Sequence, residues 1–466
     1  MSAEALEDLD DFYRRCSTTL RSEDSELANL LRHEYFRQNN SLVLVAAAGL
    51  MDPSVMACTG SVLENITSEG YPDCRFHGGS ETVDHIERLA IARAKTLFGA
   101  QYANVQPHSG TSANLAVMAS LLSPGDKILG LDIRAGGHLS HGANASITGQ
   151  YFTAIAYGLN AQGLIDYEQV RQLAQRHRPK LIVCGASAYP RRIDFARFRA
   201  IADTVGALLL ADVSHIAGLI VAKQHPSPID YAHVTTTSTY KQLNGPRGGL
   251  ILAGRDAANL VTSGQEPLAQ LLQRAVFPLC QGTPNFAAIA AKARALDIAA
   301  SANFRALIAR TVENAQALAS ELTRRGYSVV TGGTDTHMVL LDLRPTGLTG
   351  IAVERALESC GIISNRNTIP GDSNPPKIAS GIRFGTNVLA QRGLGPNEMA
   401  HCAQLIETAI NAMSSSSELT IEMRRRIGSE VLGLCQRFPL PGHVFASRTR
   451  DWAGSEAGLA SENVSA

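Results

Sequence analysis

A lysine between a run of hydroxyl residues and a glycine-rich turn is the strongest chemical signal in this 466-residue sequence. Lys241 stands in HVTTTSTYKQLNGPRGG, after five hydroxyl residues and Tyr240. A nucleophilic lysine needs a fixed position and a lowered pKa. The end of a strand beside a phosphate site provides the first, and a neighbouring cation such as Arg247 contributes to the second. The alternative, a surface lysine at a strand end, suits an isolated lysine but not this context.

A carboxylate at the end of the preceding apolar run gives the lysine a partner. In GALLLADVSHIAG, Asp212 ends the run and His215 follows it. Open α/β sheets bind ligands at the carboxyl ends of their strands. A carboxylate there pairs with a protonated pyridine nitrogen and keeps the ring an electron sink. Asp212 alone is equally well explained as a helix N-cap, but Asp212 and Lys241 on successive strand ends favour pyridoxal phosphate (PLP).

Three further motifs fit such a cofactor. In QPHSGTSANLAV, Ser109, Gly110 and Thr111 open a helix, whose free N–H groups form an anion site suited to a phosphate. Ordinary N-capping is the alternative for this motif. In GGHLSHG, the spacing of His138 and His141 does not support a metal site, and a histidine stacked on the cofactor ring fits better. We therefore predict no metal.

An arginine in SGIRFGT suits a carboxylate ligand. Arg383 lies in a short predicted strand of the second domain. Arginine binds a carboxylate through two parallel hydrogen bonds. A structural salt bridge is the equally weighted alternative.

Helices and short apolar strands alternate from about residue 80 to residue 300. Helical spacing of apolar residues predicts helices in ETVDHIERLAIARAKTLFG, DYEQVRQLAQRH and DFARFRAIADTVG. The runs DKILGLD, PKLIVCG, GALLLAD and GGLILAG are typical of strands buried on both faces, as in a parallel sheet. We predict an α/β fold with a mostly parallel central sheet in a large domain and a smaller α+β C-terminal domain.

The predicted organisation has four parts. They are an N-terminal helical arm over 1–50, a large domain over 51–305, a small domain over 306–441 and a disordered tail over 442–466. In the arm, Leu27, Leu30, Leu31 and Tyr35 share one helix face, as in a packing or dimerisation element.

Composition narrows the choice of partner. Lys+Arg 42 balance Asp+Glu 42, so no general attraction to nucleic acid or to an anionic membrane is expected. The eight cysteines form no CxxC pair, and the acidic N-terminus has no signal-peptide core. We therefore expect a small-molecule substrate and a cytoplasmic location with reduced thiols.

Six segments together resemble the serine hydroxymethyltransferase (glycine hydroxymethyltransferase) family of fold-type I PLP enzymes. They are EGYP (69–72), GAQYANVQPHSG (99–110), GGHLSHG (136–142), DVSHIAG (212–218), GPRGG (245–249) and SGIRFGT (380–386). The resemblance runs from about Leu42 to Pro441. It implies a one-carbon transferase in amino-acid metabolism, with tetrahydrofolate as co-substrate and a homodimer or homotetramer whose active sites are shared between subunits.

The resemblance also implies a role for each matching residue. Lys241 would be the Schiff-base lysine, Asp212 would hold the pyridine nitrogen, His138 would stack on the ring and Glu69 would be an acid/base carboxylate. The remaining cofactor contacts would be Ser109, Gly110, Thr111, Ser187, His215 and, from a partner subunit, Gly282. Arg383 would bind the substrate carboxylate. The folate pocket would comprise Ile133, Gly136, Gly137, Leu139, Asn367 and, from a partner subunit, Phe277.

The substrate shell departs from the family pattern. The family usually reads LIASEN where this chain has LVAAAG, so Ala47 replaces a serine. Thr67 replaces a tyrosine, Phe76 and His77 replace a Tyr-Tyr pair, and Tyr240 replaces a histidine. We therefore place Ala47, Thr67, His77 and Tyr240 near the substrate. Ala47 and Thr67 open space, and His77 either adds an acid/base group or fills volume.

Three functions remain open on the sequence alone. The first is a folate-dependent hydroxymethyltransferase acting on serine or an α-substituted serine. The second is a folate-independent aldolase or transaldolase of β-hydroxy amino acids, similar to threonine aldolase. The third is an inactive relative serving as a binding subunit, which the intact Lys241, Asp212 and Arg383 disfavour.

Overall fold

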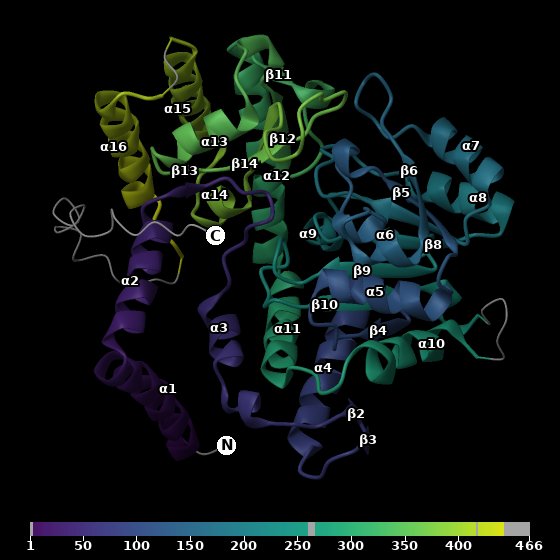
Figure 1. Ribbon diagram of the computed structural model, residues 1–466. Helices are drawn as coiled ribbons and strands as arrows, with labels where there is room; N and C mark the ends of the chain where they lie inside the picture. Colours follow the sequence, from purple (N-terminus) through teal and green to yellow (C-terminus); the bar gives the residue numbers. More distant parts are fainter. Residues whose placement is uncertain (1–2, 260–265, 416–417, 442–466) are drawn as a thin grey trace.

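The computed structural model describes residues 3–259, 266–415 and 418–441, so the predicted tail over 442–466 lies outside the described residues. Figure 1 shows a large α/β layer structure, a C-terminal domain beside it and an N-terminal pair of helices along one side. No described helix is long and apolar enough to cross a membrane.

A seven-stranded sheet forms the centre of the large domain. Its strands are β4 (Tyr102–Asn104), β5 (Lys127–Leu131), β6 (Thr153–Tyr157), β7 (Leu181–Gly185), β8 (Leu208–Asp212), β9 (Val234–Ser238) and β10 (Gly249–Ala253). Their order is β4-β10-β9-β8-β7-β5-β6, and β5 to β9 run parallel. The predicted sheet is confirmed, except that the run GGLILAG forms β10, which is antiparallel to both of its neighbours. A continuous apolar run indicates that a strand is buried on both faces, and β10 is. The run does not indicate whether the strand is parallel or antiparallel to its neighbours.

Alternate residues of each strand pack into two different hydrophobic cores. Leu129 faces one core and Ile128 the other, and Leu209 and Leu210 divide in the same way. Helices cover both faces. They are α4 (Glu81–Phe98), α7 (Tyr167–His177), α8 (Phe195–Val205), α9 (Ala217–Val221) and α11 (Phe286–Ala299) against the first core, and α5 (Gly110–Leu121) and α10 (Leu268–Arg274) against the second. Short α3 (Pro53–Thr59) and α6 (Ile147–Tyr151) complete the layer.

The predicted helices formed where the apolar spacing placed them. Gly99 ends α4 in the left-handed conformation with φ +69°, which a glycine adopts without strain.

The C-terminal domain has its own sheet and its own core. Its four strands, in spatial order, are β11 (Ser328–Val329), β12 (Met338–Asp342), β15 (Gly381–Gly385) and β14 (Asn365–Asn367), all antiparallel. Its helices are α12 (Ala302–Arg324), α13 (Gly350–Glu358), α14 (Asn387–Gln391), α15 (Pro396–Ser415) and α16 (Ile421–Arg437). The domain division itself stays a prediction. The long helix α12 crosses the predicted boundary at residues 305 and 306 and links the two regions (Figure 1).

The N-terminal arm consists of α1 (Ala3–Glu23) and α2 (Ser25–Asn39). No residue of α2 is buried, and Leu27, Leu30 and Leu31 are 44 to 57% exposed. The chain then enters the C-terminal domain, because β1 (Leu42–Val43) pairs in parallel with β13 (Ile362–Ile363) and Leu42 belongs to that domain's core. The arm predicted over 1–50 is therefore helical only up to Asn39.

A buried arginine fixes the hairpin of β2 (Gly70–Tyr71) and β3 (Cys74–Arg75) to α4. Arg75 is paired with Asp84 at 2.8 Å and with Glu87 at 2.5 Å, and it donates to the Gly70 carbonyl at 2.7 Å. Burial raises the pKa of Glu87, and Arg75 opposes that rise. Gln106 also donates to the Glu87 carboxylate and to the Gly70 carbonyl. The hairpin therefore has a fixed position relative to the central sheet.

We predict that Arg75→Met lowers the free energy of unfolding by about 3–5 kcal/mol, because Glu87 would remain buried without a cation. Arg37→Met is the matched control. Its partner Glu34 is half exposed, and the loss should stay below about 1 kcal/mol. Urea unfolding followed by circular dichroism measures both. Equal losses in the two variants would contradict the structural role of Arg75.

Candidate active site

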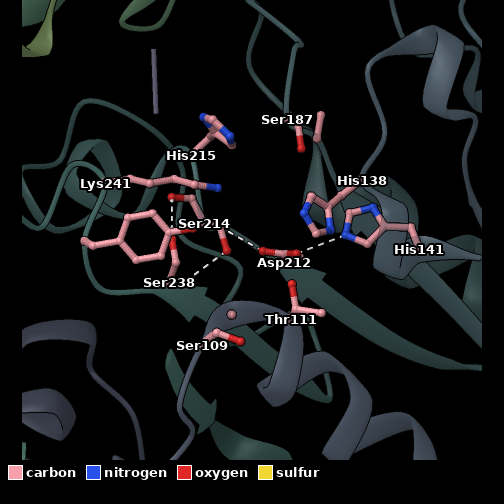
Figure 2. Close-up of a pocket in the computed structure, with 13 residues that line it drawn as sticks. Ser109, Thr111, His138, His141, Ser187, Asp212, Ser214, His215, Ser238 and Lys241 are labelled. Carbon is pink, nitrogen blue, oxygen red and sulfur yellow. Dashed lines mark hydrogen bonds and ion pairs between the residues drawn. The ribbon is translucent and has the colours of Figure 1, made fainter. Parts of the chain in front are cut away.

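One pocket lies where the parallel strands end. Its lining residues are Ser109, Gly110, Thr111, His138, His141, Ala186, Ser187, Asp212, Ser214, His215, Ser238, Tyr240 and Lys241. They follow β5, β7, β8 and β9 at their carboxyl ends or open α5. Figure 2 shows these side chains converging, with the Lys241 amine directed toward Asp212 and His138. The sheet thus gathers most of the residues predicted to bind the cofactor.

Lys241 is buried three residues after β9. Burial lowers the pKa of its amine to about 8, the Asp212 carboxylate opposes this, and Arg383 and Arg247 lower the pKa further. The Arg247 guanidinium covers the Tyr240 ring at 3.9 Å. The expected effect of Arg247 is therefore present, but burial is the main cause of the lowered pKa. A larger neutral fraction near neutral pH makes the amine a better nucleophile.

Asp212 is held as a buried anion at the end of β8. Its carboxylate accepts hydrogen bonds from Asn114 at 2.8 Å, from the Ser214 backbone N–H at 3.0 Å and from His141 Nε2 at 3.0 Å. Burial alone would raise the pKa of Asp212, but these hydrogen bonds and the His141 and Lys241 charges hold it well below its usual range. Such an anion can stabilise a protonated ring nitrogen.

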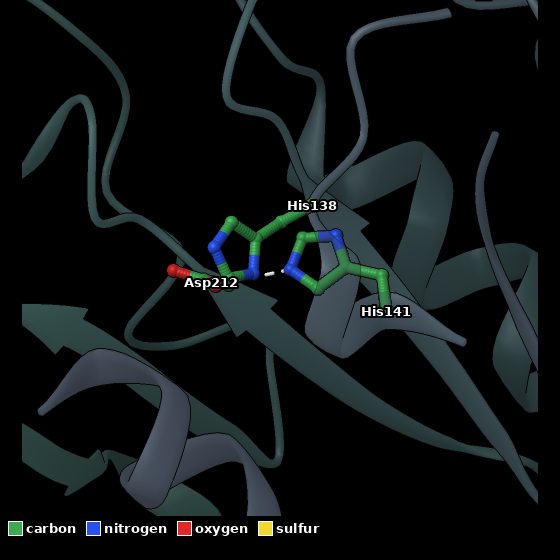
Figure 3. Close-up of side chains that lie close together, drawn as sticks. All are labelled: His138, His141 and Asp212. Atoms are coloured by element: carbon green, nitrogen blue, oxygen red, sulfur yellow. Dashed lines mark hydrogen bonds and ion pairs between the residues drawn. The ribbon is translucent and has the colours of Figure 1, made fainter. Parts of the chain in front are cut away.

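The two histidines of the glycine-rich loop lie together beside Asp212, as Figure 3 shows. His138, His141 and Asp212 each offer a ligand atom, all within 4.8 Å of one another. His141 Nε2 is already engaged with Asp212, and His138 Nδ1 is 2.8 Å from Ser140 Oγ. Burial lowers the pKa of His138 to about 4, so its ring is neutral at physiological pH. A neutral ring suits stacking against an aromatic ligand.

The N-terminus of α5 opens toward the pocket. Ser109 caps the helix by accepting from the Ser112 N–H at 2.9 Å. At Gly110, a Cβ would lie 3.1 Å from Ser214 Oγ and 3.2 Å from the Ser238 nitrogen, so a glycine permits this close approach. The Ser109 N–H donates to Ser112 Oγ at 2.8 Å, which completes a capping box. The N–H groups of Gly110 and Thr111 and the Ser109 and Thr111 hydroxyls remain the candidate donors for an anion there.

Arg383 lies on β15 of the C-terminal domain and reaches the rim of the pocket. Its Nη1 donates to the Ser187 carbonyl at 2.5 Å and its Nε to Asn365 at 3.2 Å. Burial lowers the pKa of Arg383 to about 10. Within the described residues, no carboxylate pairs with it. The described residues therefore offer no partner for the salt-bridge alternative, and the binding of a substrate carboxylate by Arg383 stays a prediction.

His215 is buried and lines the pocket beside Lys241 (Figure 2). Its ring stacks on that of His337, with centroids 6.0 Å apart, and burial holds the pKa of His215 well below its usual range. The Nδ1 atoms of His215, His337 and His141 have no partner among the described residues.

The predicted folate residues form a rim outside this pocket. Gly136 has φ +96°, and a Cβ there would lie 2.6 Å from the Ala188 carbonyl oxygen, so only glycine fits. Leu139 and Ile133 are 50% and 40% exposed. Asn367 is the last residue of β14. Thr368, which follows it, donates its hydroxyl to the carbonyl of Arg134 at 3.3 Å. The loop over 133–139 and the Asn367 region are therefore neighbours.

Glu69, Phe277 and Gly282 lie together elsewhere and do not line the pocket. A Cβ on Gly282 would lie 3.0 Å from Glu69 Oε1. The rings of Phe277 and Phe76 pack edge to face, with their centroids 5.6 Å apart, and Phe76 is 71% exposed. We call this group, with Thr67 and His77, the hairpin surface. The family resemblance predicts that Phe277 and Gly282 contribute to the active site of a partner subunit. Glu69 lies next to these two residues and not in the pocket of its own chain.

The four predicted substrate-shell residues are divided among three places. Tyr240 lines the pocket. Ala47 belongs to a segment that packs on the lysine turn, since a Cβ on Gly49 would lie 2.4 Å from the Lys241 carbonyl oxygen. Thr67 is exposed, and His77 Nδ1 accepts from the Glu69 N–H at 3.3 Å on the hairpin surface.

Sequence reasoning missed several polar residues of the pocket. They are Asn114, Ser214, Ser238 and the partnership of His141 with Asp212. Asn114 lies one helical turn after Gly110, so the 3.6-residue helical period was a signal that could have placed it on the same face as the predicted phosphate site. Nothing in the spacing indicated the others.

The pocket fits PLP in each of its polar parts. It offers an anion site at the start of α5, a buried anion at Asp212 and a buried amine at Lys241. Fold and site together define a fold-type I PLP enzyme.

Comparison with known proteins identifies the family. The family model for serine hydroxymethyltransferase matches residues 20–406. A protein named serine hydroxymethyltransferase 2 from Ralstonia nicotianae is 46% identical over 425 residues, which is 91% of this chain and 98% of that protein. Proteins of the same name from Cupriavidus pinatubonensis and Burkholderia pseudomallei are 45% and 46% identical over the same shares. This chain therefore belongs to the serine hydroxymethyltransferase family.

We predict that the uptake of PLP by the cofactor-free chain rises with pH with a midpoint near pH 8, because only the neutral Lys241 amine reacts. In Asp212→Asn, the nearby anion that favours the ammonium form is lost, so the midpoint should move to lower pH. Absorbance of the bound cofactor measures uptake. A simple alkylamine titrated in parallel corrects for the ionisation of PLP itself. A midpoint close to the usual lysine pKa of about 10.4 would contradict the assignment.

Proposed function

We propose that this chain interconverts serine and glycine, with tetrahydrofolate as the one-carbon carrier. The observation that carries the proposal is a buried amine, Lys241, facing a buried anion, Asp212, beside Arg383, which has no carboxylate partner within the described chain. An amino acid offers the complementary carboxylate. Membership of the family favours hydroxymethyl transfer over the folate-independent aldolase.

Arg383 positions the substrate in this proposal. Its guanidinium is anchored on one side by the Ser187 carbonyl and by Asn365, and its remaining N–H groups are directed to the amino acid. A charge-assisted hydrogen bond contributes roughly 1.5–3 kcal/mol. Bound in this way, the substrate has its Cα beside Lys241.

The chain's own residues control protons and charge around the reacting carbon. Lys241 Nζ would be the nucleophile that holds the cofactor and later helps release product. Asp212, held by Asn114 and His141, would keep a proton on the ring nitrogen. His138 would lie against the ring, and its neutral imidazole would not repel a positive charge there. When bound, PLP supplies an electron sink for the electron pair left on Cα.

A second copy of the chain completes the site in this proposal. Glu69 lies on the hairpin surface and not in the Lys241 pocket, and it is beside Gly282. We propose that each subunit presents Glu69, Phe277 and Gly282 to the other subunit's pocket, in a homodimer or a larger assembly. There Glu69 exchanges the proton of the hydroxymethyl group.

The exposed rim is the proposed folate site. Ile133 and Leu139 give an apolar surface, and Asn367 gives a polar group for the pterin edge. The loop that carries them also carries His138, so the folate site and the cofactor site adjoin. All eight cysteines are free thiols, which supports our expectation of a cytoplasmic location.

The altered residues favour a second substrate, an α-substituted serine. Ala47 and Thr67 are smaller than the residues usual in the family, and the segment of Ala47 lies against the Lys241 turn. An apolar pocket discriminates a methyl group by only about 1–3 kcal/mol. A preference for the α-substituted substrate would therefore be visible but incomplete.

The function is tested by measuring the cleavage of serine, α-methylserine and threonine with and without tetrahydrofolate. We expect folate-dependent turnover of serine or α-methylserine. Lys241→Ala should retain less than about a hundredth of that turnover, as is usual on loss of a nucleophile or base. Turnover of threonine alone, independent of folate, would instead identify the aldolase.

We predict that Arg383→Lys raises the Michaelis constant for the amino acid about tenfold or more, a cost of about 1.4 kcal/mol, and changes kcat less. Lysine keeps the charge but loses the planar fork. Steady-state kinetics separates the two constants. Arg366→Lys is the control, because its partner Glu354 lies on α13, within the C-terminal domain. An unaltered Michaelis constant in Arg383→Lys would place the substrate carboxylate elsewhere.

A further inference from the structure

A second buried lysine lies beneath the phosphate site, on α11. Lys292 is 2% exposed. Its Nζ donates to the carbonyls of Val105 at 2.6 Å, Pro107 at 3.0 Å and Gly249 at 3.1 Å. An ammonium group has three donors, and here each one has a partner. Lys292 is therefore not available as a second nucleophile.

The three carbonyls belong to two segments that meet at the start of α5. Val105 and Pro107 lie in the loop between β4 and α5, which leads directly to Ser109, Gly110 and Thr111. We call residues 105–109 the phosphate loop. Gly249 begins β10 and donates its N–H to the Pro107 carbonyl at 2.9 Å. Lys292 thus joins the phosphate loop to the central sheet.

Two glycines allow the close packing around the ammonium. A Cβ on Gly249 would lie 2.3 Å from the Ser109 carbonyl oxygen, and a Cβ on Gly248 would lie 2.3 Å from Lys292 Cε. Both contacts are closer than a side-chain carbon tolerates. The two glycines let the phosphate loop and the lysine reach the same point of β10.

The charged neighbours of Lys292 leave this role intact. Burial lowers the pKa of Lys292 to about 7, and the negative charge of Glu87 opposes this by favouring the ammonium form. Glu87 is itself occupied by Arg75 and Gln106. Lys292 therefore uses its hydrogen bonds on main-chain carbonyls and not on a counter-ion.

We infer that Lys292 is a positioning residue for cofactor binding: it fixes the phosphate loop so that the Gly110 and Thr111 N–H groups and the Ser109 and Thr111 hydroxyls are presented to the phosphate. The inference rests on the proposed phosphate site at the start of α5. It assigns to Lys292 a role that acts through the loop and not through contact with PLP.

The test compares two ligands that differ only in the phosphate. PLP and pyridoxal are titrated into the full-length, cofactor-free chain, and Kd is measured for each. In Lys292→Met, the side chain keeps most of its length but becomes apolar, so the three carbonyls lose the ammonium donor and the Pro107 carbonyl keeps only the Gly249 N–H. We expect the Kd for PLP to rise about tenfold or more, while the Kd for pyridoxal changes less than about threefold.

Two further variants make the result specific. Gly248→Ala places a Cβ against Lys292 Cε and should displace the ammonium, so it should reproduce the selective loss of PLP even if Lys292→Met fails to fold. Arg392→Met is the matched control. Arg392 is a buried cation that donates to the carbonyls of Phe438 and Asn39, among others, in the C-terminal region. It should lose stability without changing the ratio of the two Kd values.

The outcomes separate the two claims. If Ser109→Ala weakens PLP binding but Lys292→Met and Gly248→Ala leave the ratio of Kd values unchanged, the inference about Lys292 is overturned and the phosphate site stands. If the wild-type chain binds PLP and pyridoxal equally well, the phosphate site itself is overturned, and the inference with it.

Discussion

An ionised carboxylate in a buried position is the constraint on which the rest of the site depends. An unpaired buried charge would take up a proton, and Asp212 would then lose its effect on a ring nitrogen. Asn114, the Ser214 N–H and His141 prevent this by donating to Asp212. These donors come from α5, from the chain after β8 and from the loop after β5. The sheet must therefore hold three elements in fixed register before the carboxylate can stay charged.

Three buried cations bind main-chain carbonyls, and two of them, Lys292 and Arg383, lie next to the pocket. Lys292 holds the phosphate loop, Arg392 holds the chain around α2 and α16, and Arg383 is anchored on the Ser187 carbonyl. A main-chain carbonyl is neutral, so it does not cancel the positive charge of the cation. That charge can therefore still act on neighbouring groups. At Arg383, that charge is what an amino-acid carboxylate would meet. At Lys241, the nearby charges of Arg383 and Arg247 add to burial in lowering the pKa.

The hairpin surface differs in character from the pocket. Arg75 and Gln106 fix the hairpin to α4 and the central sheet by hydrogen bonds. Phe76 nevertheless exposes 71% of its area, and Leu279, two residues after Phe277, exposes 57%. Exposed aromatic and aliphatic side chains next to a carboxylate are typical of an interaction surface. This arrangement supports the proposal that Glu69 serves a neighbouring subunit, and it explains why one chain gathers the cofactor residues but not Glu69.

The sequence by itself determined the parallel sheet, the helices and most of the residues that line the candidate cofactor pocket. Apolar runs of strand length and helical spacing are local patterns, and motifs such as DVSHIAG and SGIRFGT carry Asp212 and Arg383 within them. Only the tertiary structure decided the reversed direction of β10, the absence of a carboxylate beside Arg383 within the described chain, and the separation of Glu69 from Lys241. It also decided that Lys292, which resembles any helical lysine in the sequence, ties the phosphate loop to β10. Direction, pairing and burial depend on residues far apart in the chain, so no local pattern records them.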